Sequence, residues 1–211
     1  MEGTTVSKNL KVEPAEDYPP EEGCYFRGND YAPIAAAVIL QWTRGRMPPE
    51  IEKLVKMGLE SGAALAGTVQ TENIGLEKMI CNLVANPNIR YLAVCGPESS
   101  DHLVGDAILA LSLNGVDAQR RIVGARAPTP FLLNIPEEFI LRFRRQITPI
   151  DLVNEASPEV LQEAVRAACQ EEPVRFREYT LSDPGAYPEP ALRGKIAWPT
   201  ATPAQPAKTA Q

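Results

Sequence analysis

The sequence has little histidine and no long apolar run. Its 211 residues include one histidine, and the longest apolar stretch covers residues 34–40. A membrane span needs ~18 to 20 apolar residues, so we expect no membrane span of its own. The first residues, 1–11, lack the apolar core of a secretory signal. These absences predict a soluble, cytoplasmic protein.

A basic excess is also missing. The chain carries 27 acidic and 21 basic side chains, which gives a net charge of −6. Nucleic-acid-binding domains normally have a surplus of Lys and Arg, so we expect no nucleic-acid partner. Hydrophobic residues make up 44% of the chain, enough for a globular core.

Paired cysteines are absent as well. Cys24, Cys81, Cys95 and Cys169 are scattered, with no CxxC pair and no Cys/His cluster. This spacing indicates neither a structural zinc site nor a disulfide framework. The four residues are interpreted as reduced thiols, mostly buried, because free cysteine behaves as a small hydrophobe.

Several familiar catalytic and nucleotide-binding motifs are not present. The sequence has no GxGxxG, no GxxxxGK[ST], no GxSxG and no HExxH. The absence of GxGxxG and GxxxxGK[ST] means that no sequence motif supports nucleotide binding. The absence of GxSxG argues against a serine hydrolase, and that of HExxH against a zinc hydrolase. Ser99 and Ser100 lie near His102, but neighbours in sequence rarely form a catalytic triad.

Proline marks the ends of the predicted domain. Nine of the 20 prolines fall in residues 1–22 and 183–211. The first stretch is acidic, the second is rich in Pro, Ala and Thr, and neither has apolar periodicity. Such segments bury too little surface to offset their ordering entropy. We predict an acidic disordered tail over 1–22, one domain over 23–182 and a disordered tail over 183–211.

Within this domain, apolar strands alternate with amphipathic helices. Repeated strand–helix units predict an α/β, Rossmann-like three-layer fold with a mostly parallel sheet. Ligands of such sheets bind beyond the carboxyl ends of the strands, here in the loops 67–75, 96–101 and 124–134. The predicted strands cover 31–42, 63–70, 89–96, 120–126 and 148–154, and the predicted helices 48–61, 71–88, 102–115, 136–147 and 157–170, the last with Ser157 as its N-cap.

His102 follows the strand 89–96 at the ligand-binding edge of the sheet. A neutral imidazole can coordinate a metal through one nitrogen while the other donates to a carboxylate, for which Asp101 and Glu98 are the nearest candidates. One histidine cannot build a protein-only zinc site. A metal that arrives with most of its coordination filled, as in haem or a corrinoid, needs only one such ligand. The alternative interpretation is a solvated loop histidine.

The loop Thr71-Glu72-Asn73 is polar between an apolar strand and an apolar helix. Thr71 is predicted as the helix N-cap, which leaves Glu72 and Asn73 able to face a ligand. Glycines in the same edge loops, among them Gly96, can admit a ligand closely because they lack side chains.

Four ordered blocks carry a resemblance to a known family. They read TENIGLEKMICNLVANPNIRYLAVCG, DHLVGDAILALSLNGVD, RIVGAR and NIPEEFILRFRRQI. Together they resemble the A subunit of tetrahydromethanopterin S-methyltransferase, from about Gly28 to Gln170. The resemblance implies a Rossmann-like corrinoid protein that carries a methyl group on cobalt. The methyl group would pass from a subunit that uses methyl-tetrahydromethanopterin to a step that methylates coenzyme M.

The resemblance also assigns roles to residues. The histidine of the family's HxxG motif is the axial cobalt ligand, which is His102 here, and Gly105 completes the motif. His102 is therefore the expected catalytic and metal-ligating residue. The cobamide, a cobalt-containing corrinoid, is expected to contact loop residues on the same edge, namely Thr71, Glu72, Asn73, Gly96, Asp101, Leu103 and Gly105.

The chain departs from the family at its end. Archaeal members usually finish in a membrane helix, whereas this chain finishes in a polar tail, so the resemblance is to a soluble form. We expect a methyl carrier that serves a pterin-dependent methyltransferase and a second methyltransferase. A non-catalytic binding or regulatory relative is the main alternative. A nucleotide-binding, flavodoxin-like module is a third, and its binding would not depend on His102.

Overall fold

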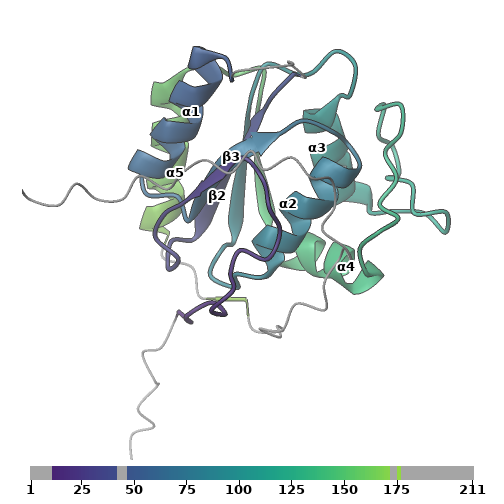
Figure 1. Ribbon diagram of the computed structural model, residues 1–211, viewed down its shortest axis with the longest axis horizontal. Helices are drawn as coiled ribbons and strands as arrows, with labels where there is room; N and C mark the ends of the chain where they lie inside the picture. Colours follow the sequence, from purple (N-terminus) through teal and green to yellow (C-terminus); the bar gives the residue numbers. More distant parts are fainter. Residues whose placement is uncertain (1–10, 42–46, 172–174, 177–211) are drawn as a thin grey trace, which may run out of the picture.

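A twisted five-stranded sheet lies between two layers of helices in the computed structural model (Figure 1), which describes residues 11–41, 47–171 and 175–176. Strands and helices alternate along most of the chain, as predicted. The strands are β1 (Tyr25–Arg27), β2 (Ile34–Ile39), β3 (Leu65–Val69), β4 (Tyr91–Gly96) and β5 (Thr148–Val153), and the helices are α1 (Pro49–Glu60), α2 (Ile74–Val84), α3 (Val104–Asn114), α4 (Glu137–Gln146) and α5 (Pro158–Gln170).

The strand order in the sheet is β1-β3-β2-β4-β5. Strands β2 to β5 are parallel, and only β1 runs antiparallel, against β3. The predicted α/β fold with a mostly parallel sheet is therefore confirmed. From β2 the chain first moves to β3 on one side and then crosses back to β4 on the other. The carboxyl ends of β2 and β4 thus form the topological switch point, where ligands of such sheets bind.

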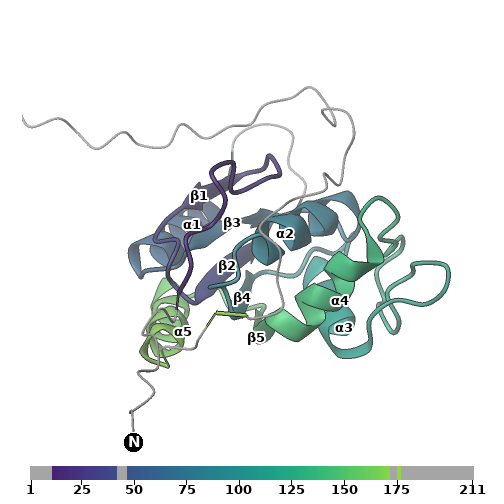
Figure 2. The ribbon, with the colours of Figure 1, turned by 90° about the horizontal axis from the view of Figure 1, so that it is seen from below.

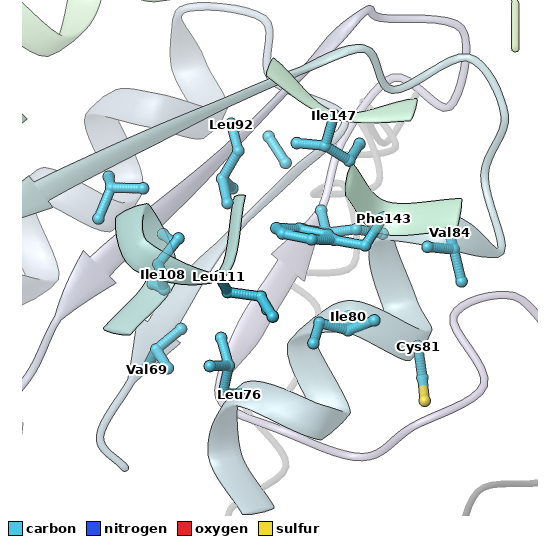
Figure 3. Packing of buried hydrophobic residues seen from close by; sticks show 14 of the residues in the cluster. Val69, Leu76, Ile80, Cys81, Val84, Leu92, Ile108, Leu111, Phe143 and Ile147 are labelled. Atoms are coloured by element: carbon cyan, nitrogen blue, oxygen red, sulfur yellow. The ribbon is translucent and has the colours of Figure 1, made fainter. Parts of the chain in front are cut away.

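Helices cover both faces of the sheet (Figures 1 and 2). α1 and α5 pack on one face, and α2, α3 and α4 pack on the other. All six residues of β2 are buried because the strand is central and covered on both sides. Figure 3 shows the larger core, where Phe143 of α4 meets Ile80 of α2 and Leu111 of α3.

The start of α5 follows its sequence signals. Pro158 occupies the first turn, where its missing N–H costs nothing, and the Ser157 side chain accepts a hydrogen bond from the Val160 N–H at 3.3 Å. Ser157 is therefore the N-cap, as predicted.

Two of the strands differ from the prediction. β1 was not predicted, because a three-residue strand has too little pattern to recognise. The predicted strand 120–126 is instead part of the long α3–α4 connection (residues 115–136), where only two isolated bridges form, Val116 with Ile122 and Arg121 with Phe131. Ile122 is fully buried while Val123 is 43% exposed. A single apolar pair of this kind is too short to tell a strand from a loop.

The N-terminal segment also differs from prediction. Residues 11–22 pack on the domain instead of forming a tail: Tyr18 is only 3% exposed, and both backbone groups of Val12 bond to the Asn88 side chain. The Glu21 backbone pairs in the same way with Asn82. Side-chain amides thus order a segment without apolar periodicity. Residues 1–10 and 177–211 of the predicted tails lie outside the described residues.

The outer edge of β5 has few backbone N–H groups free to pair with another strand. Thr148 and Asn154 donate their N–H groups to Arg90 and Gly96, so even-numbered residues face β4. Odd-numbered residues therefore face outward. Of these, Pro149 has no N–H, and the N–H of Val153 donates to the Asp151 carboxylate at 3.0 Å.

All four cysteines are thiols rather than disulfide partners, and burial raises the pKa of Cys95 to about 12. In the described ranges, no helix combines the length and the apolar character needed to cross a bilayer.

Candidate functional site

Three loops meet around one buried carboxylate at the carboxyl edge of the sheet. Glu72, after β3, contacts Nδ1 of His102, after β4, through Oε2 at 2.7 Å. Its Oε1 accepts hydrogen bonds from the N–H of Thr129 at 2.9 Å and from the Thr129 hydroxyl at 2.7 Å. Each of the three residues comes from, or directly follows, one of the loops predicted to bind a ligand.

Strand order explains why residues so far apart in sequence meet. β3 and β4 lie on either side of β2, so their carboxyl ends are separated by a single strand. Glu72 and His102 follow those two ends and are 30 residues apart in the chain. Thr129 reaches the pair from the α3–α4 connection, which passes over the same edge.

Glu72 is fully buried and ionised. Burial by itself raises the pKa of Glu72, but hydrogen bonds from the Thr129 hydroxyl, from backbone N–H groups of Glu72 and Thr129, and from His102 outweigh burial. The net effect is a pKa below the ordinary value of a glutamate. A buried anion with this many donors is a fixed negative charge beside the imidazole.

The contact with Glu72 fixes the roles of the two ring nitrogens of His102. An ionised carboxylate can only accept, so Nδ1 donates to it, and Nε2 has a free lone pair whenever the ring is uncharged. The side chain is 32% exposed, and Nε2 has no hydrogen-bond partner among the described residues. An imidazole held this way is suited to bind a metal through Nε2.

The expected hydrogen-bond partners of His102 are wrong. Asp101 lies beside the Ser100 hydroxyl, 3.4 Å away. Glu98 accepts from the N–H groups of Gly105 at 3.1 Å and Asp106 at 2.8 Å, at the start of α3. Both residues are close to His102 in sequence, but the turn of the loop directs the ring toward Glu72 in the loop that follows β3.

Leu103 follows His102 in a strained conformation. Its backbone lies in the left-handed region, with φ 45° and ψ 51°, which costs a non-glycine residue about 1 to 2 kcal/mol. Its side chain packs partly buried against the main core, so the structure gives it a role in anchoring the loop. Strained backbone of this kind is concentrated at functional sites.

The start of α2 differs in detail from the prediction. Asn73, rather than Thr71, is the N-cap, with its Oδ1 accepting from the Ile74 N–H at 2.7 Å. The Thr71 hydroxyl accepts from Gly75 at 2.9 Å. Nδ2 of Asn73 donates to the Thr129 hydroxyl at 3.1 Å, so this loop contributes to the same cluster.

Two predicted glycines have clear backbone reasons. Gly96 ends β4 at φ 94°, in the left-handed region, and a Cβ there would lie 3.3 Å from the Ile39 carbonyl oxygen. A Cβ on Gly105 would lie 2.7 Å from Val153 Cγ2 and 2.8 Å from both Glu98 Oε2 and Ile39 Cδ1. The space at Gly105 is therefore filled by the protein itself.

The α3–α4 connection is held by three carboxylates. Glu72 binds Thr129, Asp106 accepts both the N–H and the Nε–H of Arg126, and the buried Glu77 accepts the N–H and the side-chain amide of Asn134. In each case one carboxylate receives a backbone and a side-chain donor from the same residue. These pairs were not predicted, since nothing in the local pattern signals contacts across 20 to 57 residues.

A further polar contact bridges the switch point. Nε2 of Gln41, after β2, donates to the Ser100 hydroxyl at 3.0 Å.

No group of three or more His, Cys, Asp or Glu side chains within the described residues is arranged to hold an ion. The site therefore offers one imidazole donor, supported by one carboxylate.

Comparisons with known proteins bear on what this site serves. The family model for the A subunit of tetrahydromethanopterin S-methyltransferase matches residues 11–192. Methanothermobacter thermautotrophicus has two such proteins. Its tetrahydromethanopterin S-methyltransferase A subunit 1 is 37% identical over 81% of this chain and 68% of its own length. Its A subunit 2 is 39% identical over 86% of this chain and 87% of its own. The A subunit of Methanopyrus kandleri is 39% identical over 85% of this chain and 66% of its own. The chain belongs to the family of tetrahydromethanopterin S-methyltransferase A subunits.

Proposed function

We propose that this chain is a cobamide-binding methyl carrier in which Nε2 of His102 would hold the cobalt. The observation that carries the proposal is the contact between Nδ1 of His102 and the buried Glu72 carboxylate. It leaves a single, oriented nitrogen donor at the ligand-binding edge of the sheet. One donor is what a metal needs when a macrocycle already fills most of its coordination sphere.

The residues around His102 suit this role. A bound cobamide supplies a cobalt ion that carries the methyl group. Glu72 holds the Nδ1 proton, fixes the ring orientation and raises the basicity of Nε2. Gly96, Asp101 and the 71–73 loop lie on the same edge and are the proposed surroundings of the macrocycle.

The geometry also connects His102 to the α3–α4 connection. His102 and Thr129 bond to the two oxygens of the same carboxylate. A shift of the imidazole would therefore be passed through Glu72 to Thr129. We propose that partner proteins recognise the state of the carrier from this connection.

The proposed partners follow from the family. Relatives are named as subunits of a methyltransferase, so we propose that this chain acts with a pterin-dependent methyltransferase that donates the methyl group and a second methyltransferase that accepts it. The thiol state of all four cysteines is consistent with a reducing compartment, and the proposal places the carrier in the cytoplasm.

The nucleotide-binding alternative finds little support at α3. The N-terminus of a helix that follows a parallel strand is where such modules bind phosphate. Here the Glu98 carboxylate already accepts from the Gly105 and Asp106 N–H groups. A phosphate would have to displace a built-in anion, which argues against that use of the edge.

The test is the visible spectrum of the purified protein after reconstitution with a cobamide. Wild type is compared with His102→Ala. A second variant, His102→Ala with Gln119→His, returns an imidazole to an exposed turn beyond the opposite end of α3. Because the chain has one histidine, this control separates coordination by His102 from coordination by any available imidazole.

We expect wild type to retain the cobamide with a Co(III) spectrum shifted by imidazole, and both variants to lack that shift. A cobamide retained with the same spectrum in all three proteins would exclude His102 as the ligand. No retention by any of them would overturn the carrier proposal and favour a binding or regulatory relative of the same fold.

A further inference from the structure

The loop that presents His102 is closed by a carboxylate that the family motif does not include. Glu98 accepts three backbone N–H groups: those of Ser99 at 2.9 Å, Gly105 at 3.1 Å and Asp106 at 2.8 Å. Its own N–H donates to Oδ1 of Asn154, after β5, at 3.0 Å. The carboxylate therefore joins both ends of residues 98–106.

These bonds account for the otherwise unsatisfied donors at the start of α3. The first turn of a helix has N–H groups with no partner inside the helix. The Glu98 carboxylate accepts the N–H groups of Gly105 and Asp106. The Ser99 hydroxyl accepts the N–H group of Val104 at 3.4 Å. A charged acceptor at this position also interacts favourably with the helix dipole. The turn at Leu103 is thus held from both sides.

Gly105 makes room for this carboxylate. Oε2 of Glu98 lies 2.8 Å from where a Cβ of residue 105 would stand, and the Ile39 and Val153 side chains close the remaining space. A side chain at 105 would clash with the Glu98 carboxylate as well as with Val153 and Ile39. The glycine is therefore explained by contacts within the protein, without any contact to a cofactor.

We propose that Glu98 and Gly105 are positioning residues for His102. The carboxylate of Glu98 fits against α3 because Gly105 has no side chain, and together they hold the strained turn that directs the ring toward Glu72. This inference rests on the proposed function for its consequence in cofactor binding. Its structural content concerns the chain alone and can be tested without a cofactor.

The test uses the single histidine as a probe. Long-range ¹H–¹⁵N NMR of the ¹⁵N-labelled protein without cofactor reports which ring nitrogen carries the proton, at a pH where free imidazole is neutral. The variants are Glu98→Gln, which turns an NH₂ toward a backbone N–H, and Gly105→Ala, which removes the space for the carboxylate. Ile108→Val, in the buried face of α3, is the control for destabilisation alone.

We expect the wild type and Ile108→Val to show the Nδ1–H form. Glu98→Gln and Gly105→Ala should lose this signature as the ring leaves Glu72, although all three variants lower the Tm by a few degrees. Unchanged ring signals in folded Glu98→Gln and Gly105→Ala would overturn the inference.

Cobamide binding provides the second measurement. We expect the Kd of Glu98→Gln to rise about tenfold, as for other residues that orient a metal ligand, with no change for Ile108→Val. If wild type binds no cobamide, the proposed function fails while the NMR comparison still decides the positioning role. If cobamide binds through His102 but the ring signals are unchanged, only the positioning role fails.

Discussion

The two edges of the sheet are held by different chemistry. At the amino edge, buried side-chain amides of Asn82, Asn86, Asn88 and Gln146 bond to backbone groups, and those of Asn82 and Asn88 tie the N-terminal segment to the domain. At the carboxyl edge, buried or half-buried carboxylates do the equivalent work for the loops around His102.

The difference matters because the two kinds of group respond differently to their surroundings. An amide is neutral, has both donors and acceptors, and keeps its bonds at every pH. A buried carboxylate keeps its bonds only while it is ionised, and its charge acts on neighbouring groups. The hydrogen bonds of the amino edge therefore do not depend on pH, whereas those of the carboxyl edge depend on charge. The single histidine, His102, lies at the carboxyl edge.

The largest expected effect is at the amino edge. Nε2 of Gln146 lies 2.9 to 3.2 Å from three carbonyl oxygens, those of Leu83, Asn86 and Ile89. Gln146→Leu keeps the volume but removes the amide NH₂ that donates to these carbonyl oxygens, and we expect the free energy of unfolding to fall by about 3 kcal/mol. Urea denaturation measures the loss. If the loss of unfolding free energy varied with pH between 4 and 7, or if there were no loss, the amino edge would not differ from the carboxyl edge in the way described.

A smaller effect, with a defined pH dependence, is expected at Glu72. Glu72→Gln cannot accept from His102 and Thr129 together as the carboxylate does, and should cost about 2 kcal/mol at neutral pH. The folded-state pKa of Glu72 lies below its ordinary value of 4.5, so its stabilisation is complete above pH 4.5 and is lost as the pH falls through the folded-state pKa. The difference between the two proteins in urea denaturation should therefore shrink in acid. A constant difference would mean that the charge of Glu72 contributes nothing.

The smallest effect is expected at an exposed member of the charged edge. The Arg126 side chain is 76% exposed and pairs with Asp106 at 2.7 Å, while its backbone N–H bonds to the same carboxylate. Arg126→Ala removes only the exposed half of this contact. We expect a loss below about 0.5 kcal/mol, which shrinks further at high salt because an exposed ion pair is screened. A loss above 1 kcal/mol would show that charge stabilises this edge even where water reaches it.

The sequence predicted most of the fold because the helices and central strands have strong local patterns. The stripe of Leu76, Ile80 and Leu83 sets α2, and the unbroken apolar run of β2 indicates a covered central strand. The unpredicted strand β1 and the wrongly predicted strand 120–126 have a shared reason. Their conformations depend on partners distant in the sequence, and neither has enough residues to show a period.

The candidate site was predicted only in part. The position of His102 follows from strand, loop and helix in succession, which the sequence displays. Its partner Glu72 follows from strand order, since only a sheet with β3 and β4 on either side of β2 brings those loops together. Sequence distance instead favoured Glu98 and Asp101. The contribution of Thr129 depends on the path of an irregular connection, which no local pattern specifies.

The outer edge of β5 has a consequence for how copies of this molecule meet. A strand laid against that edge would find no N–H at Pro149, and at Val153 an N–H already bonded to Asp151. Only the N–H of Asp151 remains to donate from the outward positions, beside a carboxylate that repels an approaching carbonyl. These groups oppose a regular hydrogen-bonded ladder with another strand, so pairing of two chains along β5 is disfavoured.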